Sequence, residues 1–125
     1  MIAYDLALEE IKKHLRPGDV IFTRLNAAME ASSASNKAEV LALIDADGMM
    51  RGILELQAIE KNKLPVKIIV FENDGANRDL CKIASAFKIS TCSALMWETF
   101  LKRIELLFSF NGPFVMVVHT ESDVA

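Results

Sequence analysis

Two apolar runs, at residues 40–45 and 66–71, dominate the hydrophobic pattern of the chain. They read VLALID and VKIIVF, so apolar residues follow one another almost without alternation. Such runs are typical of strands in a parallel sheet that is covered by helices on both faces. The amphipathic segment between them, residues 51–61, predicts a helix, and a helical crossover makes the two strands parallel. We therefore expect both strands to end at the same edge of one sheet.

The remaining hydrophobic segments alternate between helical and strand periodicity. The predicted helices cover residues 4–15, 25–31, 51–61, 78–87 and 93–108. The predicted strands cover residues 20–23, 39–45, 66–71 and 114–118, with at most a short edge strand at 88–92. Asn77 and Ser93 are candidate N-caps, and residues 32–37 read as a polar turn. This order predicts a single domain over residues 1–125, a three-layer α/β/α sandwich whose mostly parallel sheet has about five or six strands.

Composition narrows the class of protein. A net charge of −3 without a block of Lys or Arg argues against nucleic-acid binding. The apolar runs are shorter than the roughly 18–20 residues of a membrane span, and Asp5 and Glu9 are unlike a signal peptide. Cys81 and Cys92 lack metal-type spacing and are expected to stay reduced, which favours a cytoplasmic protein. The hydrophobic content of 52% predicts that some surface meets a partner chain.

Oxygen-bearing side chains follow both apolar runs. Asp45 and Asp47 follow the first run, and Glu72, Asn73 and Asp74 follow the second. Ligands of open α/β sheets bind beyond the carboxyl ends of the strands. No Lys or Arg stands beside these acids in the sequence, and a hard cation such as Mg²⁺ would relieve their repulsion. The alternative is that they are solvated turn residues without a role in binding.

The same stretch resembles the pyrophosphate-binding, C-terminal domain of thiamine-diphosphate-dependent enzymes, in shortened form. The acetolactate synthase and 2-oxo-acid decarboxylase group carries Gly-Asp-Gly after one strand and Asn-Asn after the next. This chain has Ala-Asp-Gly at 46–48 and Glu-Asn-Asp-Gly at 72–75, and Asn73 follows Asp47 by 26 residues, an interval similar to the family's. Three further segments resemble the family as well, residues 16–21, 79–87 and 111–118.

The resemblance implies thiamine diphosphate and Mg²⁺ as cofactors. The implied metal ligands are the Asp47 carboxylate, the Asn73 side-chain oxygen and the Gly75 carbonyl, and Gly48 joins them in contacting the cofactor. The implied activity is that of a lyase or transferase, the decarboxylation or carboligation of a 2-oxo acid. In this family a separate pyrimidine-binding domain carries the activating glutamate, so the resemblance implies a homodimer or a partner subunit. It identifies no catalytic residue in this chain.

The chain departs from the family pattern at several points. Ala46 replaces the first glycine, and Glu72 replaces the first asparagine and adds negative charge. The family's Gly-rich segment after residue 23 is missing, and its loop after Gly75 is shortened. These departures leave a second interpretation open, a non-catalytic α/β interaction subunit that has lost cofactor binding.

A third interpretation is a phosphohydrolase. Residues 43–48 also resemble the first motif of the haloacid-dehalogenase family, in which Asp45 would be a nucleophile and Asp47 a general acid. That motif needs a threonine where this chain has Met49, and the next strand ends without the required hydroxyl.

Overall fold

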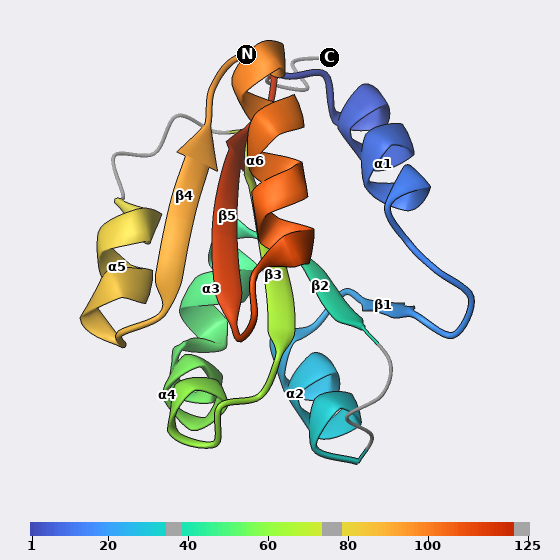
Figure 1. Ribbon diagram of the computed structural model, residues 1–125. Helices are drawn as coiled ribbons and strands as arrows, with labels where there is room; N and C mark the ends of the chain where they lie inside the picture. Colours follow the sequence, from blue (N-terminus) through green and yellow to red (C-terminus); the bar gives the residue numbers. More distant parts are fainter. Residues whose placement is uncertain (35–38, 74–78, 122–125) are drawn as a thin grey trace.

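The computed structural model describes residues 1–34, 39–73 and 79–121. Within these residues the strands form one parallel sheet in the order β1-β2-β3-β5-β4 (Figure 1). The strands are β1 (Val20–Phe22), β2 (Val40–Asp45), β3 (Val66–Glu72), β4 (Ser90–Ala94) and β5 (Phe114–His119). The helices are α1 (Tyr4–Lys13), α2 (Leu25–Ala34), α3 (Ala46–Arg51), α4 (Ile53–Lys61), α5 (Leu80–Ala86) and α6 (Trp97–Ser109).

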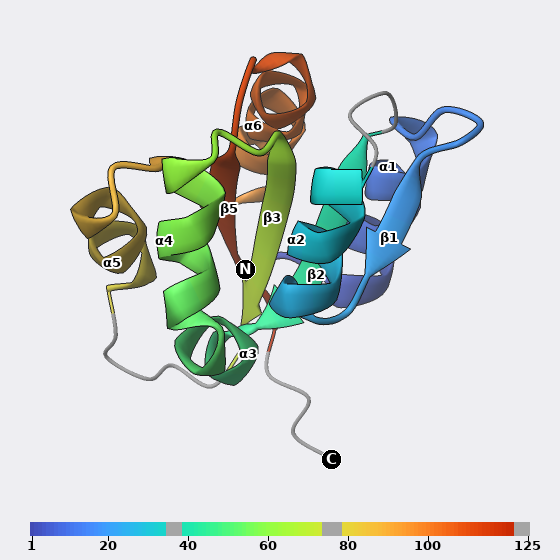
Figure 2. The same ribbon diagram turned by 90° about the horizontal axis from the view of Figure 1, so that it is seen from below.

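Helices cover both faces of the sheet (Figure 2). Helices α2, α3, α4 and α5 pack on one face, and α1 and α6 pack on the other. Strand β3 lies in the middle of the sheet and is buried along its whole length. Its side chains divide between the layers: Ile68 and Val70 join the first core, and Ile69 and Phe71 join the second. The predicted α/β/α sandwich with a parallel sheet of about five strands is confirmed.

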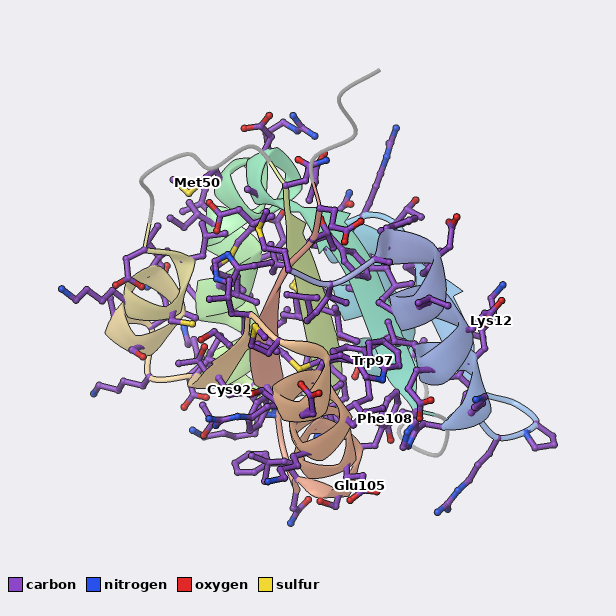
Figure 3. All side chains as sticks on the ribbon, turned by 90° about the horizontal axis from the view of Figure 1, so that it is seen from above. Lys12, Met50, Cys92, Trp97, Glu105 and Phe108 are labelled. Atoms are coloured by element: carbon purple, nitrogen blue, oxygen red, sulfur yellow. The ribbon has the colours of Figure 1, made fainter. Side chains whose placement is uncertain are left out.

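Helix α6 contributes the aromatic side of the second core. Phe100, Ile104 and Leu107 are buried against the sheet. Trp97 and Phe108 lie on the side of α6 that faces α1, whereas Glu105 points away from the protein (Figure 3). This face of α6 therefore packs against the second core, with Trp97 and Phe108 only partly buried. Among the described residues, no helix is long and apolar enough to cross a membrane.

The crossover between β2 and β3 differs from the prediction. It contains two helices, α3 and α4, and α3 begins at Ala46, directly after β2. The residues directly after β2, for which solvated turn residues were one interpretation, are therefore the first turn of a helix. Asp45 explains the early start, because its side chain caps α3.

Three other boundaries also differ. Helix α2 continues to Ala34, and Ser32 in its last turn is buried (3% exposed). Ser93 is part of β4 and caps nothing, and α6 begins at Trp97. The N-cap of α5 is Asp79, whose carboxylate accepts a hydrogen bond from the backbone N–H of Lys82, 3.0 Å. Asn77, the predicted cap, lies outside the described residues.

Candidate functional site

Strands β2 and β3 are neighbours and parallel, and they end at the same edge of the sheet. Their register pairs Asp45 with Phe71. Asp47 is the second residue of α3, directly beyond β2, and Asn73 is the first residue beyond β3. The two side chains predicted to bind one metal ion thus come from adjacent strand ends. Gly75, the third predicted ligand, lies outside the described residues.

The turn between β2 and α3 is held by Asp45. Its Oδ1 accepts a hydrogen bond from the backbone N–H of Gly48, with an N···O distance of 2.6 Å. A Cβ atom at Gly48 would lie 3.1 Å from this oxygen and 3.4 Å from Cβ of Ile44. A side chain at residue 48 would therefore crowd the cap. Asp45 and Gly48 fix the backbone that carries Asp47, which itself is exposed.

A cleft of about 410 Å³ opens at this edge. Asn73 and Gly48 line it, but Asp47 does not. The other lining residues come from several elements: Tyr4, Thr23, Leu43, Ile44, Asp45, Arg51, Phe71, Thr120 and Glu121. The cleft is larger than the lower size of ordinary small-molecule sites, about 300 Å³.

Arg51 corrects one inference from the sequence. The acids were expected to have no arginine or lysine beside them, yet Arg51 lines the same cleft as Asp45. It lies four residues after Asp47, and residues four apart share one side of a helix. The spacing of four residues between Asp47 and Arg51 is the sequence signal that could have revealed this arginine. Tyr4 and Thr120 reach the cleft because Ile2 pairs with Thr120, a contact between the chain's first and last described segments.

Glu72, which follows Phe71 in β3, places a carboxylate in the interior. Its side chain is 4% exposed, and Oε1 forms no hydrogen bond within the described residues. Oε2 lies 4.0 Å from Nδ1 of His119, which is opposite Glu72 in the neighbouring strand β5. A buried carboxylate oxygen without a donor is costly unless a proton or a cation satisfies it.

The donor set at this edge matches the chemistry of a hard cation. A carboxylate from Asp47 and an amide from Asn73 are oxygen ligands of the kind that Mg²⁺ prefers. Among the described residues, no three His, Cys, Asp or Glu side chains gather as a metal site. The predicted ligand set needs only one residue of those types, since its other two ligands are an amide and a main-chain carbonyl. By the chemical type of their oxygen atoms, Asp47 and Asn73 fit Mg²⁺.

The cysteines take no part in this site. Both are free thiols, and Sγ of Cys81 donates to the carbonyl of Cys92 at 3.6 Å. Burial raises the pKa of Cys92 to about 11, so its thiol stays protonated at neutral pH. Neither cysteine is placed to act as a nucleophile in the cleft.

Two solved structures share this fold. A proposed thiamin diphosphate-dependent enzyme from Mycobacterium smegmatis has a TM-score of 0.88 and 14% identity, covering 96% of this chain and 32% of its own. The thiamine diphosphate-dependent 4-hydroxybenzoylformate decarboxylase of Rhodococcus jostii RHA1 has a TM-score of 0.73 and 22% identity. The match covers 79% of this chain and 23% of the decarboxylase chain. The fold is thiamine-diphosphate-binding-domain-like. No protein-family model and no curated protein sequence matches this chain.

The two neighbours support the fold, and at that level they help to choose between the interpretations of the sequence. The chain spans about a third and about a quarter of the length of these two neighbours. The phosphohydrolase interpretation is not favoured, because the structural neighbours are thiamine-diphosphate-dependent enzymes and β3 ends in Glu72 instead of a Ser or Thr.

Proposed function

We propose that this chain is a thiamine-diphosphate- and Mg²⁺-binding domain or subunit related to 2-oxo-acid decarboxylases and acetolactate synthases. One observation carries the proposal: Asp47 and Asn73 follow adjacent parallel strands, and Asn73 lines a cleft of about 410 Å³ at that edge. This is the edge at which α/β sheets bind ligands. The likeness to two thiamine-diphosphate-dependent enzymes supports the choice of cofactor.

In this proposal the residues of the chain hold the cofactor by its diphosphate. Asp47, Asn73 and the Gly75 carbonyl bind Mg²⁺, and Gly48 allows the backbone to approach closely. When bound, thiamine diphosphate supplies the stabilised carbanion that decarboxylation or carboligation of a 2-oxo acid requires. The glutamate that activates the pyrimidine ring comes from a partner subunit that carries the pyrimidine-binding domain.

Calorimetry or a thermal shift with thiamine diphosphate and Mg²⁺ tests the binding. A ligand at 100 times its Kd stabilises a folded protein by about 2.7 kcal/mol, so the melting temperature rises by several degrees. Asp47→Asn removes the proposed charged metal ligand and is expected to abolish most of the rise. Glu105→Gln makes the same change on the exposed side of α6 and should leave the rise intact.

A non-catalytic interaction subunit is the second candidate. It is favoured by Ala46 and Glu72, which replace the family's glycine and asparagine at the edge. In that case millimolar cofactor causes no thermal shift. A pull-down with a pyrimidine-domain partner, followed by cofactor titration of the pair, separates a site that needs its partner from a site that is lost.

A further inference from the structure

The cleft has a second half, which the sequence did not indicate. This half has a volume of about 510 Å³ and lies where α2 begins and α3 gives way to α4. Thr23, Ile44, Gly48 and Arg51 line both halves, so the two spaces are adjacent. The residues that line only the second half are Arg24, Leu25, Asn26, Gly52 and Glu55. A ligand held beside Asn73 could extend into this space.

Charge divides unequally between the two halves. The first half is lined by Arg51 together with the carboxylates of Asp45 and Glu121. The second half is lined by Arg51 and Arg24 and by one carboxylate, that of Glu55. An anion is therefore attracted to the second half, where the guanidinium groups outnumber the carboxylates.

Both arginines are available to a ligand. Their side chains are exposed, and within the described residues neither one takes part in an ion pair or a side-chain hydrogen bond. A guanidinium group presents a planar fork of donors that matches phosphate oxygens, and such charge-assisted hydrogen bonds are the strong ones. Thr23 and Asn26 add a hydroxyl and an amide to the lining.

We propose that Arg24 and Arg51 form a subsite that binds a diphosphate group directly, without a metal ion. The proposed function supplies the identity of the natural ligand, but the subsite itself can be tested with inorganic pyrophosphate alone. Two cations at one subsite match the charge of a diphosphate group better than a single cation does. Mg²⁺ then strengthens an interaction that the arginines already provide.

The test is titration of the full chain with inorganic pyrophosphate in EDTA, followed by calorimetry at low and at higher salt. Binding is expected without metal and should weaken as salt rises. Arg51→Gln and Arg24→Gln should each weaken it about tenfold or more, and the double variant should abolish it. Arg51→Lys keeps the charge and should retain part of the affinity. Arg103→Gln, on α6, removes an exposed charge from another surface and should change nothing.

The outcomes separate this inference from the proposed function. If pyrophosphate does not bind in EDTA, or if Arg51→Gln binds it as well as the unaltered chain does, the subsite is refuted. If thiamine diphosphate binds only with Mg²⁺ and is insensitive to Arg51→Gln, the proposed function stands and the subsite fails. If pyrophosphate binds through the arginines while thiamine diphosphate never binds, the subsite stands and the proposed cofactor is wrong.

Discussion

Lys67 carries its ammonium group into the interior of the sheet. The residue is 2% exposed, and its Nζ donates hydrogen bonds to the carbonyls of Phe110 and Gly112, the latter at 2.5 Å. Nζ also lies 5.4 Å from the centroid of the Phe110 ring. Burial lowers the pKa of Lys67, and the negative charge of Glu39 opposes this shift. The cation thus satisfies carbonyls just beyond α6 that would otherwise lack donors.

Glu39 gives the protein a predictable dependence on pH. Burial raises the pKa of its carboxyl above the ordinary value of 4.5, a carboxylate at Asp19 adds to this, and Lys67 and Arg16 oppose it. The folded chain therefore binds more protons than the unfolded chain just above pH 4.5. The free energy of unfolding that this group contributes is present below pH 4.5 and is lost as the pH rises through the folded pKa.

Glu39→Gln removes this loss. We expect the free energy of unfolding of the variant to exceed that of the unaltered protein by a margin that grows between pH 4 and pH 7. Urea unfolding at several pH values measures the margin. Glu30→Gln, which removes an exposed carboxylate from α2, is the control. A margin that stays constant with pH, or that favours the glutamate at pH 7, contradicts the prediction.

At the residue scale, the sequence could predict features that depend on neighbouring residues, but not contacts between residues far apart along the chain. The strand ends placed Asp47 and Asn73 at one edge, and the structure gives that placement. The partners of Lys67 were beyond prediction, because Phe110 lies 43 positions away along the chain. Glu72 was predicted to lie with the other acids at the sheet edge, and its burial was missed because it depends on β5 lying beside β3.

Gly52 separates α3 from α4 and lets them pack closely on α2. A Cβ atom at this position would lie 3.0 Å from both Cβ and Cδ2 of Leu25. Leu25 is 3% exposed, and its Cβ is fixed by the backbone of α2. The close approach explains why a glycine suits this position, because a larger residue would push α2 away from the crossover.

Gly52→Ala is expected to lower the free energy of unfolding by about 1–3 kcal/mol, despite the better helix propensity of alanine. Thermal or urea unfolding measures the loss. Gln57→Ala, on the exposed side of α4, should change stability by less than about 0.5 kcal/mol. If Gly52→Ala is as stable as the unaltered protein, the contact with Leu25 is looser than the structure indicates.

The types of the elements were predictable from periodicity, whereas their ends depended on caps. Stripes at helical spacing predicted α1, α5 and α6. The choice of Asp79 over Asn77 as the cap of α5 depended on a carboxylate that reaches the N–H of Lys82. The pattern predicted Asn77, because Asn and Asp are both favoured N-cap residues and spacing alone does not separate them.

For the whole molecule, the parallel sheet followed from the apolar runs, but the strand order did not. Strand β5 lies between β3 and β4, so the last strand of the chain is inserted beside the central one. Whether a strand lies at the edge or in the middle of the sheet depends on how whole strands pack, which the sequence pattern does not reveal. The same arrangement places Thr120 beside Ile2, with backbone hydrogen bonds of 3.0 Å from Ile2 to His119 and from Glu121 to Ile2.

Ligand binding in the cleft is expected to slow hydrogen exchange at the amides of Ile2 and Glu121. Tyr4, Thr120 and Glu121 line the cleft, so a ligand that contacts them disfavours opening of the Ile2 bridge. At 100 times Kd the protection can reach about 100-fold. The amide of Asn62, which donates to the carbonyl of Ala58 just before β3 begins, is the reference. If the amide of Asn62 is protected as much as those of Ile2 and Glu121, or if these two are not protected, the cleft and the Ile2 bridge are not locally coupled.

The bridge between Ile2 and Thr120 also has a practical consequence for handling the protein. Met1 is exposed and only three residues from Tyr4, which forms part of the cleft wall. A purification tag fused ahead of Met1 would emerge beside the cleft and could compete with small ligands, so titrations belong on tag-free protein. A fluorescent dye attached at the same position would turn this proximity into a direct optical report of occupancy.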